Sequence, residues 1–187
     1  MFEQINSNDL ELDALYLGIL TARKVKPLSR LEYPVKLCII DAIKKMGLIF
    51  EPVTRLARNG NHVKHWIMGK DRSLFDQYQV DFDGKLLEGN KEQLIRSEAS
   101  YFGYPVCCAE NYINSPYAPN KLMINDQRLL FHYACPDCEE TPRLIPLYKA
   151  ALEEAEELFE ELQNMHYSKV GCTSQYFSFN SLTGKKI

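Results

Sequence analysis

The chain has 187 residues, a mass of 21.6 kDa and 45% apolar residues, which is enough for one core of ordinary size but not for two. Its 25% content of charged residues is typical of globular proteins and excludes disordered, collagen-like and low-complexity chains. A net charge of −3 and a pI near 5.8 argue against nucleic-acid binding by the whole molecule and leave room only for a local basic patch.

The apolar runs and the first residues bear on the compartment. Residues 1–4 have neither the basic region nor the apolar stretch of a secretory signal. The best apolar run, residues 37–43, contains Asp41 and is far shorter than the roughly 18 residues of a membrane span. We expect a cytoplasmic protein with no membrane partner.

Residues 1–89 predict two helices followed by a hairpin. Asn8-Asp9 can cap a first helix that carries leucines up to Leu20, and Ser29 can cap a second one that ends at Gly47. Asn59-Gly60 separates two β-like runs and is typical of a tight hairpin turn. A third β segment is expected over residues 78–82.

The hairpin region is basic. Seven lysines and arginines lie between Lys44 and Arg72, against two acidic residues. A structural role is the first interpretation. As a second interpretation, the hairpin is a ribbon for RNA, with contacts from Arg55, Arg58, Lys64 and Trp66.

Residues 90–187 predict mainly helix. The clearest helix begins at Thr141-Pro142, an N-cap followed by proline, and continues to about Met165. Its apolar residues are spaced by three and four, and a run of glutamates occupies the other side, which we interpret as a solvated face. The apolar stripe of residues 142–165 can pack on the core or form a homodimer. The expected fold is therefore a helix-rich α+β single domain, residues 1–187, with a small antiparallel hairpin, a long C-terminal amphipathic helix and a cysteine-containing helical half.

Six cysteines carry the strongest functional signal. Four of them form two pairs, Cys107-Cys108 and Cys135-x-x-Cys138, and His132 precedes the second pair by three residues. A C-x-x-C turn places two thiolates on one side of a knuckle, and a tetrahedral zinc ion then needs two further ligands. Because neighbouring residues on a helix diverge by about 100°, we expect only one of Cys107 and Cys108 to bind.

Alternatives fit the same residues. The cysteines can be small buried hydrophobes or a cytosolic dithiol redox pair, and an iron–sulfur cluster is the second choice of cofactor after zinc. Cys38 is expected in the core, and Cys172 is a further candidate ligand.

Two resemblances follow from these motifs. The strings Phe102-Gly103-Tyr104-Pro105-Val106-Cys107-Cys108 and Cys135-Pro136-Asp137-Cys138 resemble a small, mainly archaeal family of uncharacterised proteins, a domain of unknown function. That resemblance implies a shared cysteine site. Cys108-Ala109-Glu110 followed by Cys135-x-x-Cys138 is similar to the zinc signature of cytidine-deaminase-like enzymes, which implies a catalytic zinc with Glu110 as proton shuttle.

Three functions are therefore compatible with the sequence. The first is a metal-binding domain with a structural zinc site. The second is a zinc-dependent hydrolase of deaminase type that uses Glu110. The third is an RNA-binding accessory protein that uses the basic hairpin. A closed site with four ligands favours the first, and an open site with three ligands beside Glu110 favours the second.

Overall fold

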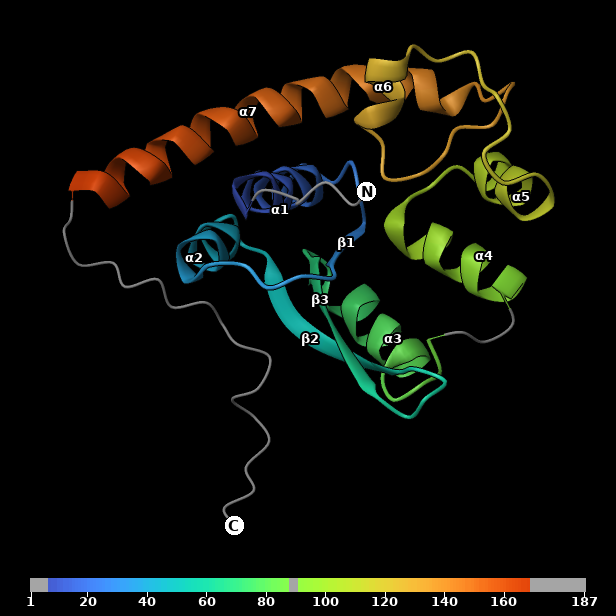
Figure 1. Ribbon diagram of the computed structural model, residues 1–187, viewed down its shortest axis with the longest axis horizontal. Helices are drawn as coiled ribbons and strands as arrows, with labels where there is room; N and C mark the ends of the chain where they lie inside the picture. Colours follow the sequence, from blue (N-terminus) through green and yellow to red (C-terminus); the bar gives the residue numbers. More distant parts are fainter. Residues whose placement is uncertain (1–6, 88–90, 169–187) are drawn as a thin grey trace.

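The computed structural model describes residues 7–87 and 91–168 and shows a helix-rich α+β architecture, as predicted (Figure 1). One small sheet lies among helices, and the longest helix runs along one side of the molecule. In chain order the elements are α1 (Ser7–Ala22), β1 (Leu28–Leu31), α2 (Leu37–Lys45), β2 (Ile49–Leu56), β3 (His62–Gly69), α3 (Arg72–Phe82), α4 (Lys91–Phe102), α5 (Val106–Asn114), α6 (Ile124–Arg128) and α7 (Glu140–Ser168).

The sheet is antiparallel with strand order β1-β3-β2. Strands β2 and β3 form the predicted hairpin, and the tight turn between them contains Gly60 at φ +82°, a conformation that glycine adopts without strain. The sequence did not predict a strand before this hairpin. Strand β1 adds a third, pairing Leu28 with Gly69 and Leu31 with Trp66.

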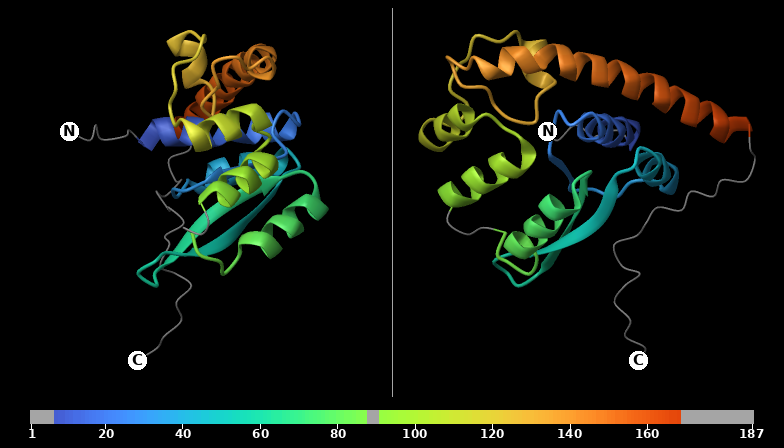
Figure 2. Two further views of the ribbon diagram at one scale, coloured as in Figure 1. Left: turned by 90° about the vertical axis from the view of Figure 1, so that its right-hand side faces the viewer. Right: turned by 180° about the vertical axis from the view of Figure 1, so that it is seen from behind.

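Two hydrophobic clusters lie on opposite faces of the sheet, because successive side chains of a strand point to opposite sides. Met68 belongs to the cluster formed with α1, α2 and α7, whereas its neighbour Ile67 belongs to the cluster formed with α3 and α4. Figure 2 shows these layers, with α1 and α7 on one side of the strands and α3 on the other. The sheet is therefore covered on both faces.

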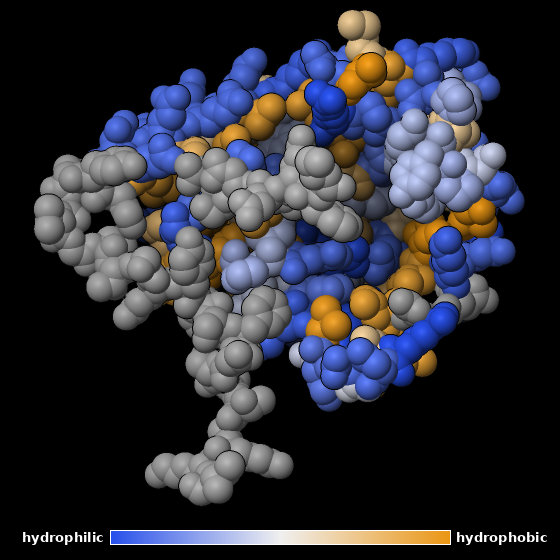
Figure 3. Space-filling model, viewed as in Figure 1, coloured by the Kyte–Doolittle hydropathy of each residue, from blue (hydrophilic) through white to orange (hydrophobic). Residues whose placement is uncertain are grey.

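Helix α7 confirms the prediction of a long amphipathic C-terminal helix. Its buried residues Tyr148, Ala151 and Ala155 belong to the cluster formed with α1 and α2, and α7 contacts α1 directly. The glutamates face outward, and the outer side of this helix is hydrophilic (Figure 3). Much of the apolar stripe that could have formed a homodimer is thus buried against other helices of the same chain.

Two local predictions are wrong. Residues 78–82 belong to helix α3, because Asp71 caps that helix by accepting hydrogen bonds from the backbone N–H groups of Ser73 and Leu74. Ser29 does not cap a helix. It lies buried in β1, where its hydroxyl is 2.8 Å from the Thr21 hydroxyl of α1.

Candidate metal centre

Both cysteine pairs meet in one place. Cys107 and Cys108 lie in the first turn of α5, and Cys135 and Cys138 lie in the loop that leads into α7. Their four Sγ atoms all lie within 4.8 Å of one another. We call these residues the four-cysteine cluster. The sequence correctly predicted that the two pairs come together, across the 26 residues between them.

Both sulfurs of the adjacent pair lie in the cluster, whereas the sequence led us to expect only one of them to bind. The Sγ atom of the exposed Cys107 is 3.6 Å from that of Cys138, and the buried Cys108 belongs to the same cluster. Two neighbouring helical residues leave the axis about 100° apart, but side-chain rotamers can bring both sulfurs toward a point between them.

The distances fit a tetrahedral metal. Zn–S bonds of about 2.3 Å place the sulfurs of a tetrahedron about 3.8 Å apart. The cluster is close to that size, and its 3.6 Å separation of Cys107 and Cys138 is well beyond the roughly 2.05 Å of a disulfide bond. All four cysteines carry free thiols. The donor set is therefore suited to a soft, thiolate-binding metal.

Backbone amides support the sulfurs. The N–H of Thr141 donates to Cys138 Sγ at 3.2 Å, and the N–H of Cys135 donates to Cys108 Sγ at 3.3 Å. The N–H of Cys138 donates to the carbonyl oxygen of Cys135 at 3.3 Å, which closes the predicted knuckle. Amide groups directed at sulfur stabilise the negative charge of a thiolate.

The thiols do not ionise equally. Burial, together with the neighbouring thiols of Cys138 and Cys135, raises the pKa of Cys107 to about 11. Burial also raises the pKa of Cys108. Burial acts in the same direction on Cys138, but hydrogen bonds from Thr141 outweigh it and hold the Cys138 pKa below its usual value. Crowded thiols resist full ionisation because thiolates repel one another, and a divalent cation removes this repulsion.

Thr141 links the cluster to His132 and was not singled out as a site residue from the sequence. Its fully buried hydroxyl is 3.1 Å from Cys138 Sγ and 3.0 Å from His132 Nε2. Its position at the start of the long helix suggested only a cap. When this hydroxyl donates to the Cys138 thiolate, it accepts from an Nε2–H group, which fixes the tautomer of His132.

His132 lies beside the four-cysteine cluster and is not a member of it. Among the described residues it reaches the sulfurs only through Thr141. Burial, with a smaller contribution from the charge of Lys26, lowers the pKa of His132 to about 4. This neutral ring leaves Nδ1 buried without a hydrogen-bond partner. His132 therefore lies next to the cluster, in contact with Thr141, and its role as a ligand stays a prediction.

Glu110 lies on α5, with its carboxylate directed at a cation. Its two oxygens accept hydrogen bonds from Arg96 of α4 at 2.6 and 2.9 Å. The Arg96 guanidinium holds the pKa of Glu110 below its usual value. This geometry favours the structural interpretation of Glu110 over a role as proton shuttle.

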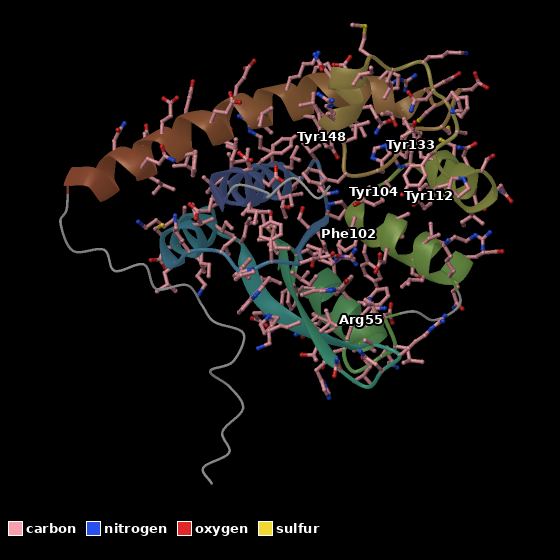
Figure 4. The ribbon with its side chains drawn as sticks, viewed as in Figure 1. Arg55, Phe102, Tyr104, Tyr112, Tyr133 and Tyr148 are labelled. Atoms are coloured by element: carbon pink, nitrogen blue, oxygen red, sulfur yellow. The ribbon has the colours of Figure 1, made fainter. Side chains whose placement is uncertain are left out.

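A cavity of about 440 Å³ adjoins the buried side of the cluster, and no motif in the sequence indicated it. Cys108 and His132 line it together with Tyr104, Tyr112 and Tyr133, which are labelled in Figure 4. The tyrosines come from three separate segments, so only folding assembles them. The volume lies in the range of small-molecule binding sites.

The RNA-binding prediction fails at one of its four residues. Arg55 is only 1% exposed and lies in the interior of the sheet and α3 region (Figure 4), where it bonds to Glu98 at 3.4 Å and to the Leu86 carbonyl at 3.0 Å. Trp66 stacks on Phe50 with ring centroids 5.1 Å apart. Arg58 is exposed and Lys64 is partly exposed. The described structure therefore gives no support to a basic RNA-binding ribbon.

Two cysteines do not belong to the four-cysteine cluster. Cys38 packs against the cluster of α1, α2 and α7, as expected for a core residue. Cys172 falls outside the described residues.

In residues 7–87 and 91–168 there is no helix of the length and apolarity that a bilayer crossing requires. Comparison of the chain with family models, curated proteins and solved structures finds no match.

Proposed function

We propose that the four-cysteine cluster binds one zinc ion in a closed site, and that the protein is a binding domain stabilised by this metal. The observation that carries the proposal is the meeting of four sulfurs within 4.8 Å, two of them accepting backbone N–H groups. Cys107, Cys108, Cys135 and Cys138 would hold the ion. A bound zinc would tie α5 to the beginning of α7 and add folding free energy directly.

A structural site is favoured over a catalytic one by the number of donors. Catalytic zinc keeps a position open for water, usually with three protein ligands. Four thiolates leave no such position, and Glu110 is held by Arg96. The loop 129–134, where the deaminase interpretation requires a strand before Cys135, is irregular. These features support a structural site over the deaminase alternative.

In this proposal the metal also stabilises one wall of the cavity of 440 Å³. Cys108 and His132 belong to its wall, and both are tied to Thr141 at the start of α7. Fixing the sulfurs therefore fixes one wall of the cavity. In this proposal the metal is structural and the cavity is the binding surface.

Metal analysis of the full chain, purified anaerobically, tests the proposal. We expect one zinc ion per chain and no visible absorption. A strong chelator should remove the metal and lower the melting temperature. Cys138→Ala should do the same, whereas Cys38→Ala, which changes a cysteine outside the cluster, should keep full zinc content.

Each other result has a definite meaning. A brown protein containing iron and sulfide would replace zinc with an iron–sulfur cluster. Protein free of metal, with a melting temperature unaffected by zinc or chelator, would refute the metal site. Glu110→Gln should leave both zinc content and the melting temperature unchanged. Loss of a hydrolytic activity in that variant would instead establish the enzyme alternative.

A further inference from the structure

Lys26 is a buried amine outside the four-cysteine cluster. It lies between α1 and β1 and is only 2% exposed. Its Nζ donates a hydrogen bond to the carbonyl oxygen of Phe102 at 2.8 Å. The structure gives Lys26 no ion pair with any described carboxylate, and a charged ammonium group is expensive to bury without one.

Aromatic rings surround this amine. The Nζ atom lies 4.4 Å from the ring centroid of Tyr104, 5.6 Å from that of Phe131 and 5.9 Å from that of Phe102. Figure 4 shows Phe102 and Tyr104 close together where α4 ends and the following loop begins. The loop approaches closely because Gly103 has φ +69°, and a Cβ there would lie 2.6 Å from Pro27 Cδ.

The same rings line a cavity of about 260 Å³ that opens beside Lys26. This cavity is separate from the larger one, although Tyr104 and Phe131 border both. Its titratable and charged lining groups are Asp13 of α1, Lys26, Arg30 of β1, Glu32, Tyr33 and Tyr104. His132 lies behind the Tyr104 ring and is close enough for the charge of Lys26 to lower its pKa.

Three of these groups have distinctive environments. Arg30 forms ion pairs with Glu98 at 2.6 Å and with Glu32 at 2.9 Å. The Tyr33 hydroxyl is buried and has no hydrogen-bond partner among the described residues. Burial, with a contribution from Asp9, raises the pKa of Asp13. An unsatisfied hydroxyl thus borders the same small space as the amine, whereas Asp13 lies at its exposed edge.

The environment also disfavours the charged form of Lys26. Burial, with a smaller contribution from the nearby charge of Arg30, lowers the Lys26 pKa to about 7. A lysine in an apolar pocket next to another cation is a recognised way to keep an amine neutral and nucleophilic at neutral pH.

From this geometry we infer that the cavity is a binding site for a small neutral aldehyde or ketone, with which the Lys26 amine forms an imine. The nitrogen lone pair attacks the carbonyl carbon, and the carbonyl oxygen takes a proton from the Tyr33 hydroxyl, which regains a proton from the nitrogen. The hydroxyl oxygen of the resulting carbinolamine takes a second proton through Tyr33 and leaves as water, while the nitrogen gives up its remaining proton and forms the C=N bond. One amine and one carbonyl compound therefore give one imine and one water, with no oxidant or reductant.

Reductive trapping on the full-length protein tests the inference. The protein is incubated near pH 7 with propanal and sodium cyanoborohydride, and peptide mapping measures the rate of N-propylation at each lysine. We expect Lys26 to react roughly ten-fold or more faster than Lys24, an exposed lysine two residues away. Lys26→Arg should abolish this fast labelling, and Lys24→Arg should leave it unchanged.

A second variant tests whether the Tyr33 hydroxyl assists the reaction at Lys26. Tyr33→Phe removes the unpartnered hydroxyl while keeping the ring, and we expect it to slow labelling of Lys26 several-fold without changing the rate at Lys24. Labelling of Lys26 no faster than Lys24 would overturn the inference. So would labelling that occurs only in urea concentrations that unfold the chain. Both results come from the wild-type protein, so they stand even if a variant fails to fold.

Discussion

Lys26→Met should change how the stability of the protein depends on pH. In the folded protein the Lys26 pKa is lowered from 10.5 to about 7, mainly by burial. Between these values the unfolded chain binds more protons than the folded one, so stability rises with pH. The shift corresponds to about 5 kcal/mol as an upper bound over the whole window. Between about pH 6 and pH 9, linkage gives roughly 2–3 kcal/mol of this rise.

The assay is urea unfolding of wild type and Lys26→Met at several pH values between these limits. Methionine removes the titrating amine and fills much the same space, so the difference in unfolding free energy between the two proteins isolates Lys26. We expect the advantage of Lys26→Met to shrink by roughly 2–3 kcal/mol as pH rises. Lys24→Met, at an exposed position, should follow the wild-type curve. If the unfolding free energies of wild type and Lys26→Met depended on pH in the same way, the Lys26 pKa would not be lowered in the folded protein.

Three further substitutions are predicted to have measurable effects, and two of them are compared with a control variant. Thr141→Val, which removes the hydroxyl between Cys138 and the histidine, should weaken zinc binding about 10- to 100-fold in a chelator competition. Arg55→Met should cost about 1–3 kcal/mol in urea unfolding, because it leaves the Leu86 carbonyl without its donor in the interior while Glu98 keeps its ion pair with Arg30, whereas Arg58→Met at an exposed site should stay within about 0.5 kcal/mol. Gly103→Ala should cost about 2–3 kcal/mol because it combines positive φ with a clash, against about 1 kcal/mol for Gly60→Ala, where φ is positive but space is open. Equal losses within either pair would contradict the proposed cause.

Local signals in the sequence determined several elements correctly. The turn at Asn59-Gly60 needs a positive φ, which glycine supplies, and the hairpin forms there. The helix predicted from Thr141-Pro142 appears as α7, because three- and four-residue spacing of apolar side chains specifies one buried stripe. The pairing of two cysteine motifs was also predictable, since thiolates with metal-ligand spacing favour a shared site.

Other features depended on contacts between distant residues. Residues 78–82 have the apolar content of a strand, but the cap at Asp71 and packing on the sheet make them helical. Strand β1 exists because it pairs with β3, more than thirty residues away in the chain. The sequence could not reveal which face of the protein Arg55 occupies, and its burial depends on Glu98 from α4.

At the four-cysteine cluster and at the Lys26 cavity, too, some features were predictable from the sequence and others arise only on folding. The donor atoms follow from composition and spacing alone: four cysteine sulfurs in two pairs. Folding brings both sulfurs of the adjacent pair together, places Thr141 between the sulfurs and His132, and surrounds Lys26 with three aromatic rings. The physical reason is that residue type and spacing fix what a side chain can donate, whereas burial, neighbouring charge and hydrogen-bond partners come from segments far apart in the chain and exist only once it has folded.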